Sequence, residues 1–144
     1  MGARSKARKR ALDILFECEV RGLPLGTTLD ERVIAGEPPV NEYTVALIRG
    51  IVEHQPRIDE LIATYAQGWS LERMPAVDRN VLRLGVLEVL YIDDVPDAVA
   101  VSEAMALVGD LSTDESPQFV NGVLGAVVRN KPTVQSAARN ERTT

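Results

Sequence analysis

Five basic side chains lie within the first ten residues of this 144-residue chain and form its most concentrated chemical feature. This basic arm contains no acidic residue. Guanidinium and ammonium groups at such density bind phosphate oxygens, so the arm predicts contact with a polyanion. Arg4 and Arg8 are four residues apart and would share one face of a helix. The five cations are Arg4, Lys6, Arg8, Lys9 and Arg10.

Side chains that could carry out catalysis are sparse. The chain has one cysteine, Cys18, and one histidine, His54, with no third group in the sequence to orient them as nucleophile and base. Single copies of each also exclude cysteine-rich and multi-histidine metal sites. The pair Asp93-Asp94 lacks the spacing of a calcium-binding loop. We therefore expect a binding protein with no metal and no cofactor, and not an enzyme.

The charge of the chain is distributed unevenly. The formal net charge is −5, but the basic arm holds five of the 16 Lys and Arg residues, which leaves 11 basic against 21 acidic residues elsewhere. An acidic body repels a polyanion, while a compact basic arm attracts one. The ligand is therefore expected at one edge of the molecule. RNA is favoured over duplex DNA, because arginine-rich segments often fold on RNA and no DNA-reading motif is present.

Apolar residues recur at helical spacing along nearly the whole chain. Valine-rich runs at 95–101 and 123–128 could form strands by propensity, but no run shows sustained alternation. We therefore predict an all-α fold. The expected helices span residues 7–18, 28–35, 41–65, 77–91 and 99–111, with a last helix from 116 and a short capped turn at 70–74.

Glycine and proline mark where these helices end or bend. Gly22 is placed to end the first helix, and Pro56 to kink or restart the third. Ser116 and Pro117 form an N-cap and first-turn pair that opens the last helix.

Three further glycines lie inside predicted helices, at Gly85, Gly122 and Gly125. We expect these small residues to permit close contact between helices.

The predicted domain covers residues 1–132 and begins with the basic arm, residues 1–10. The polar stretch 133–144 is predicted to be a disordered tail. No run approaches the roughly 18 apolar residues of a membrane span, and the N-terminus lacks the apolar stretch of a signal peptide. We therefore expect a cytoplasmic protein that does not bind membranes.

Four short runs follow one another in the C-terminal half of the chain. They are VDRNVLRLGVLEVL at 77–90, DVP at 94–96, VSEA at 101–104 and FVNGVL at 119–124. The N-terminal half adds the basic arm and then ALDILF at 11–16. In this order the motifs resemble the NusB family of transcription antitermination factors, from Arg4 to about Lys131.

This resemblance implies a fold and a function. The implied fold is all-helical, with about seven helices in two small packed subdomains. The resemblance also implies that the protein has no catalytic activity. The function is to bind the boxA element of ribosomal RNA leader transcripts together with NusE, a small-subunit ribosomal protein. The complex joins the elongating RNA polymerase with other Nus factors and suppresses termination. A homodimer is a possible further state.

The resemblance also implies which residues contact RNA. The five cations of the basic arm match the arginine-rich arm of the family, and Gln118 with Phe119 matches the position before the VNGVL run. Phe119 could stack on an unpaired base or belong to the core. Glu115, in the loop before the last helix, is expected close to the RNA path, where its charge would oppose phosphate.

The partner-facing positions of the family are matched by Asp78 and Arg79. The same two side chains could instead cap the helix and carry a solvated charge. The alternative function for the whole chain is a helical protein-interaction adaptor without direct RNA binding. Steep salt dependence would distinguish an RNA binder from such an adaptor.

Overall fold

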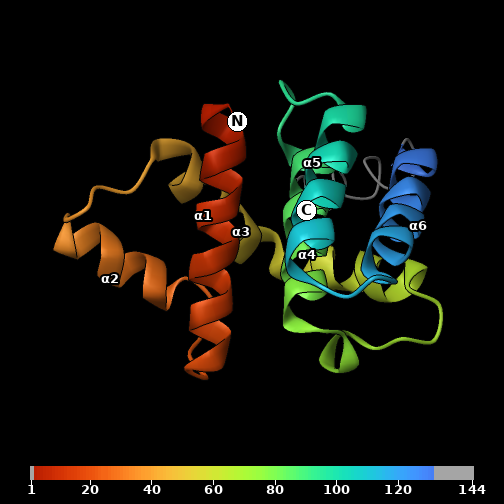
Figure 1. The fold of residues 1–144 in the computed structure, drawn as a ribbon, viewed down its shortest axis with the longest axis horizontal. Helices are drawn as coiled ribbons and strands as arrows, with labels where there is room; N and C mark the ends of the chain where they lie inside the picture. Colours follow the sequence, from red (N-terminus) through yellow and green to blue (C-terminus); the bar gives the residue numbers. More distant parts are fainter. Residues whose placement is uncertain (1, 132–144) are drawn as a thin grey trace, which may run out of the picture.

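Helices form every regular element in the described part of the chain. The computed structural model describes residues 2–131 and contains, within that range, six α-helices, one 3₁₀ turn and no strand (Figure 1). The predicted all-α class is confirmed. About seven helices were expected, and the described residues contain six α-helices and one 3₁₀ turn. The predicted tail, 133–144, lies outside the described residues. The elements are α1 (Ala3–Val20), α2 (Thr27–Ala35), α3 (Glu42–Tyr65), η1 (Leu71–Arg73), α4 (Ala76–Tyr91), α5 (Asp97–Leu111) and α6 (Ser116–Arg129).

The basic arm is part of α1, because that helix already begins at Ala3. Ala7 and Ala11 lie on its buried face and let the helix approach its neighbours closely. At the other end, Gly22 adopts a left-handed φ of 69° and donates its N–H to the carbonyl of Glu19 at 2.9 Å. This is a common way to end a helix, since glycine takes that conformation without strain. The prediction for Gly22 is confirmed.

Pro56 lies inside α3 without ending it. The helix is continuous over 24 residues, so the chain does not restart at the proline. Asn41 caps its first turn, with the side-chain oxygen accepting from the N–H of Tyr43 at 2.7 Å. Ile51 and Ile58, on either side of Pro56, are fully buried. Their packing offsets the backbone hydrogen bond that proline cannot form.

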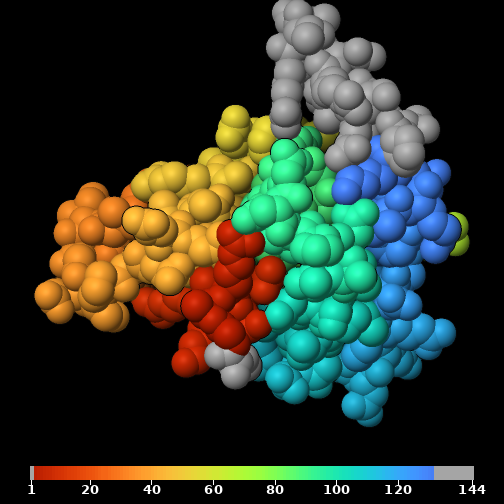
Figure 2. Space-filling model, turned by 90° about the horizontal axis from the view of Figure 1, so that it is seen from above, coloured from red at the N-terminus to blue at the C-terminus, as the bar shows by residue number. Residues whose placement is uncertain are grey.

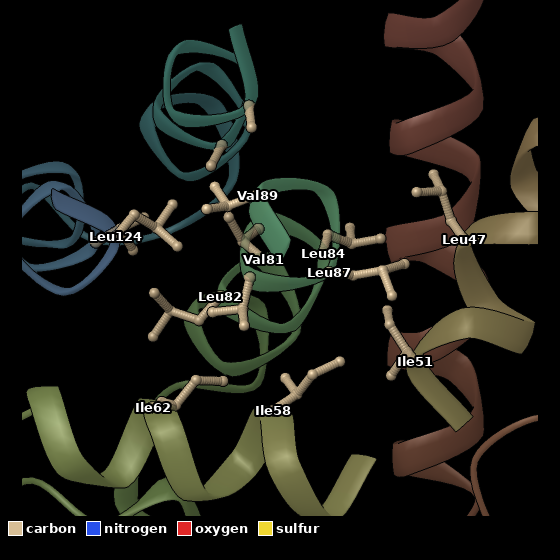
Figure 3. Close-up of a cluster of buried hydrophobic side chains, with 14 of the residues drawn as sticks. Leu47, Ile51, Ile58, Ile62, Val81, Leu82, Leu84, Leu87, Val89 and Leu124 are labelled. Carbon is tan, nitrogen blue, oxygen red and sulfur yellow. The ribbon is translucent and has the colours of Figure 1, made fainter. Parts of the chain in front are cut away.

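The central helix is α4, which packs against α1, α3, α5 and α6. Every residue from 80 to 90 is buried, and Figure 3 shows Leu87 facing Leu47 and Ile51 of α3. A helix covered on all sides is mostly apolar around its circumference, so the charged Arg83 and Glu88 must find partners inside the protein. Within residues 2–131, no helix combines the length and apolar character needed to cross a membrane.

Gly85 sets the closest approach between α4 and α6. A Cβ atom there would lie 2.7 Å from Cδ1 of Leu124, so a side chain would displace Leu124 from its present position. The prediction for Gly85 is confirmed. The predictions for Gly122 and Gly125 are wrong. A Cβ at Gly122 would meet none of the described residues within 4 Å, and one at Gly125 would meet Arg129 of its own helix.

Candidate nucleic-acid interface

Arg8 faces the interior of the protein although it belongs to the basic arm. Its side chain is 4% exposed, and Nε donates hydrogen bonds of 2.9 Å to both carboxylate oxygens of Glu88. The hydroxyl of Tyr43 donates to the same carboxylate. Burial disfavours the charged guanidinium, but the hydrogen bond and charge of Glu88 outweigh it and raise the pKa of Arg8. Arg8 thus anchors α1 to α4 and does not offer its charge at the surface.

Two other cations of the arm hold acidic partners at the surface. Arg4 donates to Asp94 at 2.9 Å, and its guanidinium carbon lies 4.3 Å from the ring centre of Tyr43. The hydrogen bond from Arg4 lowers the pKa of Asp94. Lys9 pairs with Asp13, one turn along the helix, at 2.6 Å. Both pairs are solvent-accessible, so a phosphate can compete with either acid.

The remaining two cations can bind a phosphate without first releasing an acidic partner. Lys6 is exposed and Arg10 is half-buried, and neither forms an ion pair within residues 2–131. Figure 2 shows the start of α1, in red, at the surface between α3 in yellow and α5 in green. The predicted basic arm therefore divides into one buried cation, two paired surface cations and two free ones.

Phe119 lies in the first turn of α6, at the edge of the core. The side chain is half-buried and packs against core residues, while Gln118 beside it is exposed. Its ring also contacts Trp69 in an edge-to-face arrangement, with ring centroids 4.8 Å apart. Phe119 thus packs against the core while staying partly accessible, and its stacking on an unpaired base stays a prediction. Sequence reasoning missed Trp69, although a tryptophan beside Gly68 in a polar segment could have drawn attention to it.

Asp78 is fully buried beneath the turn between α5 and α6. Ser112 donates its hydroxyl to Oδ1 of Asp78, while Oδ2 has no hydrogen-bond partner among the described residues. Ser116 is drawn into the same turn, where its hydroxyl accepts from the N–H of Thr113 at 3.3 Å. The predicted N-cap role of Ser116 is therefore wrong, and Glu115 occupies the N-cap position of α6.

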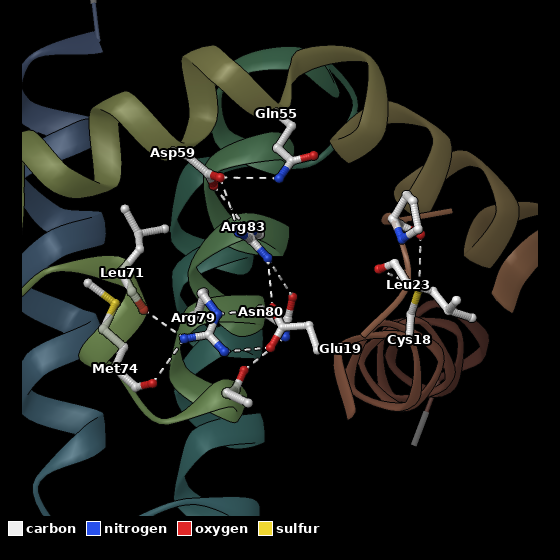
Figure 4. Close-up of polar contacts among 12 residues, drawn as sticks. Cys18, Glu19, Leu23, Gln55, Asp59, Leu71, Met74, Arg79, Asn80 and Arg83 are labelled. Atoms are coloured by element: carbon white, nitrogen blue, oxygen red, sulfur yellow. Dashed lines mark hydrogen bonds and ion pairs between the residues drawn. The ribbon is translucent and has the colours of Figure 1, made fainter. Parts of the chain in front are cut away.

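Arg79 lies in a charged network that joins α1, α3 and α4 (Figure 4). It donates from Nε to Glu19 at 2.9 Å, and Arg83 donates from Nη1 to the same carboxylate at 3.0 Å. Arg83 is also paired with Asp59 of α3 at 2.9 Å. Burial disfavours the charged Glu19, but the hydrogen bond and charge of Arg79, with the charge of Arg83, lower its pKa. The expected solvated charge of Arg79 is wrong, because its side chain is only 16% exposed.

The two predicted RNA-contacting regions lie at opposite ends of α5. Arg4 pairs with Asp94, just before α5 begins, whereas Phe119 follows the turn after α5 ends. Figure 1 shows the start of α1 at the top and the start of α6 at the bottom. The 15 residues of α5 correspond to about 22 Å. We call these regions the arm end (Arg4, Lys6, Lys9 and Arg10) and the aromatic end (Trp69 and Phe119).

Similarity to known proteins extends over nearly the whole described chain. The profile of the NusB family matches residues 5–129. The transcription antitermination protein NusB of Nocardioides sp. is 70% identical over 134 residues, which cover 93% of this chain and 99% of the relative. The solved structure of T. maritima NusB has a TM-score of 0.78 at 35% identity, covering 89% of this chain and 92% of that one. A crystal structure of antitermination factors NusB and NusE in complex with dsRNA has a TM-score of 0.74 at 29% identity, covering 88% and 96%.

Proposed function

The chain belongs to the NusB family, and from this membership we propose that it is an RNA-binding transcription antitermination factor. Its proposed ligand is the boxA element of ribosomal RNA leader transcripts, bound together with NusE. The resulting complex joins elongating RNA polymerase with the other Nus factors and suppresses termination. The observation that carries the proposal is the start of α1, which offers cations to solvent on an otherwise acidic chain.

The arm end supplies the phosphate contacts in this proposal. Lys6 and Arg10 bind phosphate directly, because no acid of residues 2–131 holds them. Arg4 and Lys9 exchange an exposed acid for a phosphate, and exposed ion pairs are weak enough for that exchange. Arg8 has a different role, since it holds α1 against α4 and thereby fixes the direction in which the other four cations point.

A single strand fits the separation of the two ends better than a compact duplex contact. An extended strand can place phosphates at the arm end and unpaired bases at the aromatic end. Gln118, exposed at the start of α6, adds a hydrogen-bonding side chain there. The related NusB–NusE complex contains dsRNA, so phosphate contact alone does not require a single strand.

NusE is the proposed protein partner, in line with the related complex. Outside the basic arm the chain has an excess of acidic residues, which complements a basic ribosomal protein. Asp78 is buried and Arg79 is held by Glu19, so we assign both to shaping the surface at the start of α4.

The architecture that serves this role is a single domain over residues 1–132. We propose that α1–α3 and α4–α6 form its two helical subdomains. In Figure 1, α1 and α2 lie on the left and α4–α6 on the right, and α3 runs from the left side to below α4. The protein acts by binding and not by catalysis, and its work on nascent transcripts places it in the cytoplasm.

Titration of a fluorescein-labelled boxA RNA at several salt concentrations tests the proposal. Fluorescence anisotropy should report binding that weakens steeply with salt, because bound phosphates release counterions. NusE should tighten that binding. A scrambled single strand and a duplex of equal length are the matched controls. A helical adaptor would bind NusE but not RNA, with or without NusE, and that result would reject the proposal.

A further inference from the structure

Trp69 is the only tryptophan of the chain, and it lies at the surface beside Phe119. It is 37% exposed. The two rings meet at 4.8 Å between centroids with their planes at 68°. An edge-to-face pair leaves part of an aromatic face uncovered, and the exposure of Trp69 shows that solvent reaches this pair. The aromatic end therefore has an open aromatic surface built from two separate elements.

The segment that carries Trp69 has a defined conformation. Gln67 and Gly68, just before it, both adopt left-handed φ values, 43° and 84°. Just after Trp69, the backbone carbonyls of Leu71 and Met74 accept hydrogen bonds of 2.6 and 3.0 Å from Nη1 of Arg79. Arg79 in turn donates to Glu19 of α1 (Figure 4). A folded loop thus presents the indole ring.

The charges near this pair distinguish a base from a phosphate. Arg73 of η1 is exposed and forms no ion pair within the described residues. Asp114 and Glu115 are exposed just before α6, on the side of Phe119. The two acids repel a phosphate placed directly on the pair, whereas a neutral base is unaffected and its phosphate can lie toward Arg73. The pair therefore favours the base of a nucleotide.

We propose that Trp69 and Phe119 form one aromatic site that holds an unpaired RNA base, with Trp69 supplying stacking surface. Every base has a flat face, so stacking on such a platform tolerates any base. This inference rests on the proposed RNA-binding function and adds to it a residue that no sequence motif indicated. A basic protein segment is the competing occupant, because the same acids would attract it.

The fluorescence of the full-length protein tests this site directly, since all tryptophan emission comes from Trp69. Titration with single-stranded boxA RNA should quench and shift that emission over the same concentration range in which labelled RNA gains anisotropy. A set of RNAs with one abasic position each should include a member that still binds but leaves the emission unchanged. If one base stacks on Trp69, removing that base, and no other, should abolish the change in Trp69 emission.

Substitutions give an independent measurement. Trp69→Leu should weaken RNA binding by about tenfold, within the range for loss of one base–aromatic stack, while Trp69→Phe should retain most of the affinity. Ile34→Ala, at an 85% exposed position on α2, is the matched control and should leave affinity unchanged. Circular dichroism checks that each variant is folded. If Trp69→Leu does not fold, the RNA affinity of Trp69→Phe and the Trp69 fluorescence of the unsubstituted protein test the aromatic site instead.

The outcomes separate this inference from the function on which it rests. RNA that binds by anisotropy without changing the emission overturns the aromatic site and leaves RNA binding intact. Emission that responds to NusE but not to RNA assigns the pair to a protein contact and also overturns it. Absence of any RNA binding in the anisotropy experiment rejects the proposed function itself, and the inference with it.

Discussion

Arg8 of α1 and Glu88 of α4, 80 residues apart in sequence, form an ion pair that is almost completely buried. One nitrogen, Nε, donates to both carboxylate oxygens at 2.9 Å, and the Tyr43 hydroxyl adds a third hydrogen bond. Neither charge is tolerated in the interior without the other. The pair therefore determines how α1 is rotated against the core, and with it which cations of the arm face solvent.

Arg8→Met should lower the free energy of unfolding by about 3–5 kcal/mol, because Glu88 would stay buried without its cation. Urea denaturation followed by circular dichroism measures this loss. Lys6→Met is the matched control on the same helix, and at an exposed position it should change stability by less than about 0.5 kcal/mol. Equal losses in the two variants would contradict the distinct roles of these cations.

The double substitution Lys6→Ala/Arg10→Ala should have the opposite profile, with stability retained and RNA affinity reduced. Each single-strand phosphate contact contributes about 0.7 to the slope of log affinity against log salt, so the slope should flatten by about 1.4. Anisotropy titrations between low and high salt measure it. Deleting residues 1–10 is a poorer test, because it also removes the buried Ala7 and Arg8 from the core. An unchanged slope would show that these two side chains do not touch phosphate.

RNA and NusE should strengthen each other's binding by the same factor. The acidic body of the chain leaves only a small positive region for RNA, and a basic partner docked beside it enlarges that region. Thermodynamic linkage requires the effect to be reciprocal. Isothermal titration of each ligand with and without the other measures both factors. Independent binding would refute the coupling.

Glu115→Gln should tighten RNA binding a few-fold at low salt and lose that advantage at high salt. Glu115 is exposed at the N-cap position of α6, close in sequence to Phe119, where its charge opposes phosphate. The same charge favours the positive end of the helix, so a small loss of thermal stability should accompany the gain. Asp114→Asn serves as the neighbouring control. Weaker RNA binding at every salt concentration would mean that Glu115 accepts hydrogen bonds from RNA.

Glu19→Gln should destabilise the protein at neutral pH and progressively less in acid. The arginine partners outweigh burial and lower the pKa of Glu19 in the folded state. The stability it contributes is therefore complete above the ordinary Glu pKa of about 4.3 and is lost as pH falls through the lower folded value. Unfolding curves of both proteins between neutral and acidic pH test this window. A difference in stability that stays constant with pH would exclude the charge as its cause.

The helices could be predicted from the sequence because an apolar stripe is a local property. The predicted segments match α1 to α6, and the end of α1 at Gly22 follows from local backbone preference. Whether Pro56 kinks or restarts the helix could not be decided locally, because buried residues on both sides of the proline keep α3 continuous.

The division of charges between interior and surface could not be predicted in the same way. Arg8 and Lys6 are both cations in one short segment, and only the acid at Glu88 buries the first of them. Asp78 likewise lies in a helix start that is typical of a surface position, yet the later turn containing Ser112 covers it. The contact between Trp69 and Phe119 joins the segment before η1 to the first turn of α6, and no sequence spacing connects the two.

The long sequence separation of Arg8 and Glu88 also has a consequence during protein synthesis. The ribosome completes α1 well before α4, so the nascent chain carries Arg8 for some 80 residues without its buried acid. Until Glu88 has been synthesised, this partner cannot bury Arg8, so all five cations of the arm are free to face solvent. Docking of α1 onto α4 then withdraws one positive charge, so that the folded state attracts nucleic acid less indiscriminately than its own precursor.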